Sequence, residues 1–252
     1  MEMIKISLKV PTAHFSVPYA LSQKKTYPIP PYSTVIGFIC NILAEREKIG
    51  KFLSKPLSLA IVGNYESIVH EYTWFRSLIR GAAGKLCRKS LNGEVEHPGM
   101  QIPVRVQTLF GVSLSIYIKA SGRSLDMLEN SFKLGNYIYP LHIGRAEDVI
   151  SEITLERIEP KIENALYTGG YTWIPAPSFF EGSHEDYEKF YRKVPGIADK
   201  INAIYKIENG FRSFNRIDVK LYNGGLPMTS PYATFKTFSD GGIPIFLAKV
   251  VK

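Results

Sequence analysis

The sequence has 252 residues, of which 45% are hydrophobic and 21% are charged. This composition is typical of a globular protein with a sizeable core and excludes a disordered or fibrous chain. The 31 basic residues outnumber the 23 acidic ones, and the net charge of +8 favours a polyanionic partner, nucleic acid before an anionic membrane surface. Two cysteines, Cys40 and Cys87, exclude a disulfide framework. No apolar run is long enough to span a bilayer, so no membrane partner is expected.

The N-terminal residues alternate between apolar and polar side chains, starting with Ile4, Ile6 and Leu8. This alternation predicts a half-buried strand that ends at Pro11, because proline cannot donate a strand hydrogen bond. The pattern is unlike a signal peptide, and together with the scarce cysteines it predicts a location in the reducing cytoplasm.

The run from Lys24 to Phe38, KKTYPIPPYSTVIGF, combines a basic pair, aromatic residues, three prolines and two hydroxyls. The prolines exclude a regular helix up to Pro31. We expect Ser33 or Thr34 to cap a helix that begins at Val35 and runs to about Lys48. The unpaired N–H groups of a helix start bind phosphate well, so the run predicts an anion site beside a stiff basic loop.

A second strand is predicted over Leu57–Val62, and residues 68–110 form one long excursion with two extended arms. Asn92-Gly93 marks a tight turn near its tip. Between Trp74 and Arg105 six basic residues stand against two acidic ones, a net charge of +4. On the returning arm Arg105 and Gln107 point to the face opposite the valines.

A strand is predicted over Val112–Ile118, followed by a helix over Leu125–Leu134 that Ser124 caps and Gly135 ends. Another strand is predicted over Tyr137–Ile143, before Gly144-Arg145. The resulting order of strand, helix, two strands, helix and strand is that of the ferredoxin-like fold, which RNA-recognition motif domains share.

After residue 149 the sequence becomes rich in turns and strands, including NRIDVKLY and PIFLAKVVK, with one helix over His184–Arg192. We therefore predict an α+β protein: a ferredoxin-like domain over 1–148, whose long hairpin spans about 68–110, and a β-rich subdomain over 149–252.

The candidate chemistry favours binding. None of the five histidines has the spacing of a metal ligand set, and we expect neither metal nor cofactor. His14 and Tyr27 share the long loop with Lys24 and Lys25, which permits two interpretations: a metal-independent ribonuclease, or a seat for a phosphate backbone. We favour the second, because binding requires no tuned pKa.

Two further residues also allow alternatives. Trp74 either stacks on a base or packs the hairpin onto the core. Arg145 either contacts a phosphate or partner, or closes its own turn through an ion pair with Glu147 or Asp148. The first strand carries Lys5, Ser7 and Lys9 instead of aromatic residues, so its open face lacks the stacking platform of an RNA-recognition motif.

Taken in order, KVPTAHFSVPYALSQKKTYPIPPYSTVIGFICNIL, a basic hairpin and PLHIGRAEDVI closely resemble the fifth CRISPR-associated protein family, here called the Cas-five family, of the repeat-associated mysterious protein (RAMP) superfamily. The resemblance is strongest over Val10–Leu43 and Leu141–Val149. It implies a ferredoxin-like domain with a hairpin "thumb" and a subunit of Cascade, the type I surveillance complex, closest to type I-B.

The resemblance also implies a role and partners. The chain would bind the 5′ handle of the CRISPR RNA, cap the backbone filament beside the backbone and large subunits, and meet target DNA as a further candidate partner. The expected function is therefore a non-catalytic RNA-binding subunit. The alternative is a metal-independent endoribonuclease that cuts CRISPR repeat RNA, although the Lys-His pair of processing family members is absent here.

The RNA-binding residues predicted from the pattern and the resemblance fall into three groups: the loop and helix start, the thumb, and the Gly-Arg turn. They are His14, Lys24, Lys25, Thr26, Tyr27, Ser33 and Thr34; Trp74, Arg76, Arg80, Lys85, Arg88, Arg105 and Gln107; and His142, Gly144 and Arg145.

Overall fold

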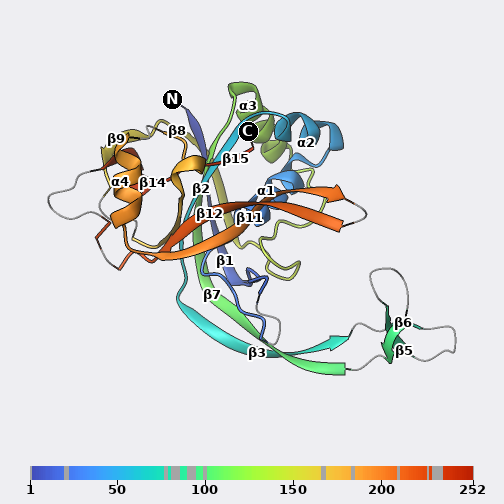
Figure 1. Ribbon diagram of the computed structural model, residues 1–252. Helices are drawn as coiled ribbons and strands as arrows, with labels where there is room; N and C mark the ends of the chain where they lie inside the picture. Colours follow the sequence, from blue (N-terminus) through green and yellow to red (C-terminus); the bar gives the residue numbers. More distant parts are fainter. Residues whose placement is uncertain are drawn as a thin grey trace.

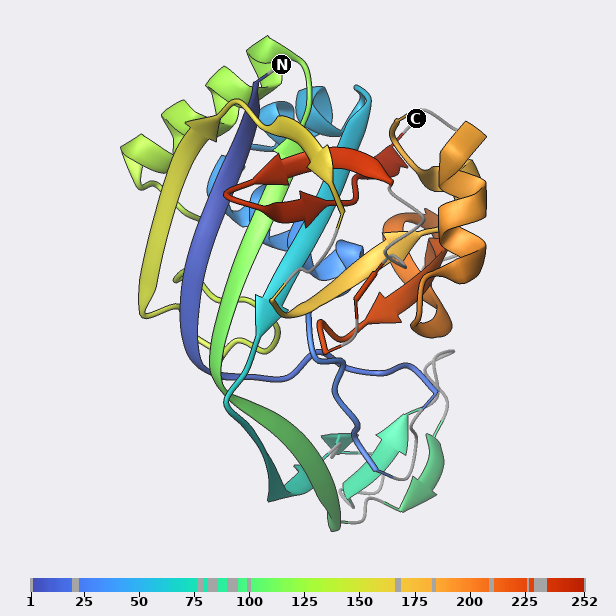
Figure 2. The ribbon, with the colours of Figure 1, turned by 90° about the vertical axis from the view of Figure 1, so that its left-hand side faces the viewer.

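The computed structural model describes residues 2–19, 23–76, 79–80, 86–89, 95–98, 101–165, 169–182, 185–208, 211–225, 227–228 and 235–251. The protein is a mixed α/β structure built on a nine-stranded antiparallel sheet (Figures 1 and 2). Seven strands lie in the order β11 (Ile197–Glu208), β12 (Phe211–Tyr222), β10 (Tyr171–Pro175), β2 (Leu57–Asn64), β7 (Gln101–Lys119), β1 (Met3–Ala13) and β8 (Glu152–Ile158). Two more join as branches: β3 (Ser67–Arg76) pairs with β7, and β15 (Ala248–Val251) pairs with β2.

Helices cover one face of this sheet, and a small second sheet covers part of the other (Figure 2). The helices on this face are α1 (Tyr32–Leu43), α2 (Arg46–Leu53) and α3 (Gly122–Leu134). A 3-10 turn (Pro177–Phe179) follows β10, and α4 (Glu185–Lys193) packs against residues of β10 and β12. The small sheet consists of β9 (Lys161–Asn164), β13 (Lys236–Asp240) and β14 (Ile243–Ile245). Three short strands lie beyond the thumb ribbon: β4 (Ile79–Arg80), β5 (Leu86–Lys89) and β6 (Val95–Pro98).

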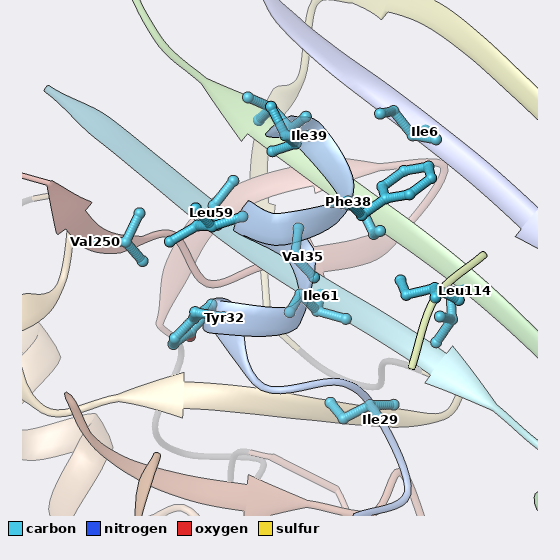
Figure 3. Packing of buried hydrophobic residues seen from close by; sticks show 14 of the residues in the cluster. Ile6, Ile29, Tyr32, Val35, Phe38, Ile39, Leu59, Ile61, Leu114 and Val250 are labelled. Carbon is cyan, nitrogen blue, oxygen red and sulfur yellow. The ribbon is translucent and has the colours of Figure 1, made fainter. Parts of the chain in front are cut away.

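The main core lies between the sheet and α1 (Figure 3). The apolar positions of β1 face this core as the alternation predicts, and Ile4 and Ile6 pair with Ile118 and Ile116 of β7. β2 is buried at every residue except its last, Asn64, because α1 packs on one of its faces and the loop after β14 on the other. Full burial of a leucine, isoleucine or valine side chain in this strand contributes about 1.5–3 kcal/mol to folding.

The thumb arms are confirmed. β3 and the first half of β7 pair from Ser67–Phe110 out to Arg76–Gln101, and this ribbon leaves the body of the protein (Figure 1). β7 is one continuous strand from the thumb into the sheet, so the returning thumb arm and a central strand of the sheet are the same element. The predicted turn at Asn92-Gly93 lies outside the described residues.

Two strand predictions are wrong at their ends. β1 does not end at Pro11 but continues to Ala13 against β7. β8 pairs with β1 only as far as Lys9, so the N–H that Pro11 lacks is not needed on that side. The segment PIFLAKVVK forms β14 and β15 instead of one strand, because Phe246 and Leu247 carry the chain from the small sheet to the large one.

The strand predicted over Tyr137–Ile143 is also wrong: these residues form a loop. The side chain of Asn41 on α1 bonds both backbone groups of Tyr139, accepting from its N–H at 2.8 Å and donating to its carbonyl at 3.1 Å. These bonds take the place of a strand ladder. The strand that lies beside β1 at this edge of the sheet is β8 instead.

The strands that follow residue 148 continue the same sheet, since β8, β10, β11, β12 and β15 all belong to it. The division of the chain at residue 148 stays a prediction. The helix predicted over His184–Arg192 is α4, which the structure describes from Glu185. Within the described residues, no helix is both long and apolar enough to cross a membrane.

The helix predicted to continue to Lys48 is interrupted. α1 ends at Leu43, Ala44 adopts φ 61°, and α2 begins at Arg46. Neither predicted cap is correct. α1 begins at Tyr32 after Pro31 with no side-chain cap, which places Ser33 and Thr34 inside its first turn. α3 is capped by Ser121, whose side chain accepts from the N–H of Ser124.

Ala44 is strained, because an L residue with a side chain disfavours positive φ. We expect Ala44→Gly to raise the free energy of unfolding by about 1 kcal/mol, measured by urea denaturation. The matched control is Ala198→Gly in β11, an exposed strand position, which should lower it by about 0.5–1 kcal/mol. Equal destabilisation by both substitutions would contradict strain at Ala44.

Candidate nucleic-acid interface

The basic loop docks on the base of the thumb. The N–H of Lys24 donates to the carbonyl of Arg105 at 3.0 Å, and the N–H of Gln107 donates to the carbonyl of Lys24 at 2.8 Å. These two bonds form a parallel bridge between Lys24 and Val106. Lys24 and Lys25 are therefore fixed beside the point where the thumb leaves the sheet.

Gln107 holds the loop through both its side chain and its backbone. Its amide oxygen accepts from the N–H of Thr26 at 3.3 Å, and its carbonyl lies 2.7 Å from Nδ1 of His14. The hydroxyl of Thr26 accepts from the N–H of Phe15 and donates to the carbonyl of Tyr27. Three predicted RNA-binding residues, His14, Thr26 and Gln107, thus make the contacts that shape the loop.

Tyr27 is buried, with 6% of its surface exposed. Its ring meets that of Trp173 edge to face at a centroid distance of 5.4 Å, and the indole N–H of Trp173 donates to the carbonyl of Pro30. Desolvation, together with the nearby Asp199 carboxylate, raises the pKa of the Tyr27 hydroxyl. Tyr27 therefore supports the loop from inside the core.

Asp148 ties the Gly-Arg turn to the start of the loop. Its fully buried carboxylate accepts from the N–H groups of His14 and Arg145 at 3.0 and 2.9 Å, and it pairs with the guanidinium at 2.9 and 3.1 Å. The bond to Asp148 raises the pKa of Arg145, which also lies 3.6 Å from Glu71 on the thumb. This geometry matches the ion-pair interpretation of Arg145.

Gly144 makes the close approach in this turn possible. Its φ is 109°, and a Cβ at this position would lie 2.9 Å from the carbonyl oxygen of His14 and 3.0 Å from Oδ2 of Asp148. Only glycine tolerates both the backbone conformation and the contact. The turn and the loop therefore behave as one packed body.

The thumb presents an exposed aromatic and basic face. Tyr72 and Arg105 are directly opposite each other in the ribbon, as are Trp74 and Pro103. The rings of Tyr72 and Trp74 are 71% and 59% exposed, which excludes packing of Trp74 in the core. The Arg105 guanidinium lies 5.3 Å from the Tyr72 ring centroid and donates to its hydroxyl at 2.7 Å.

The structure does not describe the side chains of the predicted basic residues farther out on the thumb. The backbones of Arg76, Arg80 and Arg88 belong to β3, β4 and β5, but their side chains and the whole of Lys85 lie outside the described residues.

A groove of about 550 Å³ opens beside the start of α1. Four predicted residues line it: Ser33, Thr34, His142 and Gly144. Its walls also contain three residues that the sequence interpretation missed, which belong to the β11–β12 hairpin. They are Tyr205, Arg212 and Phe214. A signal was available, since aromatic and basic residues flank the turn dipeptide Asn209-Gly210.

No group of three or more histidine, cysteine, aspartate or glutamate side chains in the described part of the chain is arranged to hold a metal ion.

The fold is shared with a chain of a solved structure described as "CRISPR RNA-guided surveillance complex". The two are 12% identical with a TM-score of 0.53, and the match covers 88% of this chain and 91% of that one. Another similar structure is a CRISPR protein from Archaeoglobus fulgidus, 12% identical over 99% of both chains with a TM-score of 0.45. A search of curated proteins found no match.

The family model described as "CRISPR-associated protein (Cas_Cas5)" matches residues 3–173. The matched part includes the loop, the thumb and the Gly-Arg turn. The chain therefore belongs to this family, and the resemblance predicted to the Cas-five family is confirmed.

We expect Gly144→Ala to lower the free energy of unfolding by about 1–3 kcal/mol, because the new methyl group meets backbone and carboxylate at positive φ. Urea denaturation measures the change. The matched control is Gly50→Ala in α2, where no atom lies within 4 Å of the new Cβ and the helix gains about 0.5–1 kcal/mol. A Gly144→Ala protein as stable as the wild type would disprove the tight turn.

Proposed function

We propose that this protein is a non-catalytic RNA-binding subunit of a type I Cascade complex, of the type I-B kind, that holds the 5′ handle of the CRISPR RNA and caps the backbone filament. Membership of a CRISPR-associated protein family supports the assignment to a CRISPR complex. The antiparallel order β2–β7–β1–β8, with α1 and α3 as the connecting helices, supports a ferredoxin-like core. Its partners would be the CRISPR RNA, the backbone subunit and the large subunit, with target DNA as a further candidate.

The observation that carries this proposal is the distribution of unpaired positive charge. Within the described residues, no carboxylate forms an ion pair with Lys24, Lys25 or Arg105 at the loop and thumb. On the open sheet face, which the small second sheet covers in part, Lys5 pairs with Asp240 of that second sheet at 2.7 Å and Lys9 pairs with Glu152 at 2.9 Å. Unpaired cations attract a phosphate backbone, and paired ones do so weakly.

Exposed aromatic residues occur beside the unpaired cations. Trp74 and Tyr72 lie on the same thumb face as Arg105, the combination that binds single-stranded RNA by stacking and charge. The groove at the start of α1 adds hydroxyl groups and Arg212. Together these features favour RNA held between the loop, the thumb base and the groove, away from the open face of the sheet.

The placement of His14 and Tyr27 supports binding over cleavage. His14 is 8% exposed and its Nδ1 faces a carbonyl oxygen, while Tyr27 is buried with a raised pKa. A general acid or base must reach its substrate with a pKa near the working pH. Neither residue meets both conditions.

We expect the double variant Lys24→Gln/Lys25→Gln to bind CRISPR repeat RNA more weakly and with a shallower salt dependence. The slope of log affinity against log salt concentration should fall by about 1.4, for two phosphate contacts with a single strand. Fluorescence anisotropy over a salt series measures it. The matched control, Lys189→Gln/Lys193→Gln on the remote helix α4, removes the same charge and should leave the slope unchanged. An equal loss in both variants would refute a local site.

Purified protein incubated with labelled CRISPR repeat RNA in EDTA should leave the RNA intact, because Tyr27 is buried with a raised pKa and His14 is 8% exposed. Gel electrophoresis of the RNA measures cleavage. Cutting that His14→Ala or Tyr27→Phe abolishes, with the fold preserved by circular dichroism, would establish the endoribonuclease instead.

A further inference from the structure

The end of the β11–β12 hairpin forms an aromatic and basic wall of the groove. A bulge between Asn202 and Tyr205 brings Tyr205 opposite Phe214, with ring centroids 5.5 Å apart. The guanidinium of Arg212 lies 4.8 Å from the centroid of Tyr205. Tyr205 nevertheless remains 44% exposed, so part of this stacked surface is open to a ligand.

The opposite wall is held rigidly. Tyr139 is 62% exposed, an unfavourable position for a large ring without a partner. Its backbone is nonetheless fixed by the two hydrogen bonds to the buried Asn41. The N–H of Ile138 donates to the Asn41 carbonyl at 3.4 Å as well. An exposed aromatic ring on a clamped loop is preorganised for contact, because little entropy is lost when it binds.

The lining of the groove selects the kind of ligand. Its residues include the hydroxyls of Ser33 and Thr34, the imidazole of His142 and the guanidinium of Arg212, but no carboxylate. Among the residues that the structure describes, Arg212 has no ion-pair partner. The volume of about 550 Å³ lies within the range of pockets that enclose a small organic ligand.

We infer that this groove binds one unpaired nucleotide of a single-stranded RNA, with its base stacked against Tyr205 and its phosphate facing Arg212. The inference rests on the proposed function and names a site within it. Aromatic and arginine side chains recognise splayed bases in this way. The hairpin starts at Ile197, beyond residue 173 where the family match ends, so the family assignment gives the hairpin wall of the groove no role.

The test uses the full chain and a ten-nucleotide single-stranded RNA of mixed sequence, carrying the fluorescent base 2-aminopurine at each position in turn. Wild-type protein should quench the fluorescence at one position, because stacking quenches this base. Tyr205→Ala should abolish that quenching and weaken binding by about 5- to 150-fold, the range expected for one lost stacking contact. Arg212→Ala should weaken both binding and quenching, because the phosphate of the bound nucleotide loses its cation. Tyr205→Phe, which keeps the ring, should bind and quench like the wild type.

The matched controls are Ile197→Ala at the exposed far end of the hairpin, where the side chain is 72% exposed, and Arg123→Ala on α3. Both should behave as wild type. Wild-type quenching and affinity in the Tyr205→Ala and Arg212→Ala proteins would overturn this inference and leave another occupant, such as a protein subunit, for the groove.

The two proposals fail in distinguishable ways. If the Lys24/Lys25 variant loses affinity while the hairpin variants do not, only the hairpin site is wrong. If the wild-type protein does not bind the RNA at all, both the proposed function and the hairpin site are wrong.

Discussion

The fully buried carboxylate of Asp148 is the contact on which the candidate interface depends. It joins the backbone of His14, the backbone of Arg145 and the Arg145 guanidinium, and Arg145 extends the network to Glu71 on the thumb. A buried carboxylate is stable only when its hydrogen bonds are satisfied. This one therefore fixes three segments that lie far apart in the sequence, and the basic loop can sit only where the turn and the thumb place it.

The positive charges of the sheet face and of the candidate interface differ in their ion pairing. Lysines of the open sheet face are neutralised by neighbouring carboxylates, whereas those of the loop and the arginines of the thumb base and the hairpin have no such partners among the described residues. Exposed aromatic rings lie beside Arg105 and Arg212. A sheet that carries RNA on its face needs the reverse, so the proposed function places RNA at the periphery of this fold.

The sequence predicts most of the elements that a local pattern of apolar and polar residues determines. Alternating isoleucines define β1, and paired extended arms define the thumb, because each pattern reflects burial of one face. Prediction from the sequence fails where contacts between residues far apart in the chain determine the structure. The side chain of Asn41 accepts a hydrogen bond from the backbone of Tyr139, and the residues predicted to form a strand there form a loop instead. The ring of Trp173, which is distant in the sequence, packs against Tyr27 inside the core. The aromatic wall of the hairpin escaped notice because its partners in the groove lie more than sixty residues away.

The central claim is that RNA lies against the loop, the thumb base and the hairpin groove and not against the open sheet face. Ultraviolet cross-linking of the protein to CRISPR RNA, followed by mass spectrometry of the linked peptides, tests it most directly. The account predicts cross-links in the peptides that contain Lys24 and Lys25, Tyr72 and Trp74, and Tyr205. Cross-links concentrated on the β1 peptide that carries Lys5 and Lys9 would contradict it.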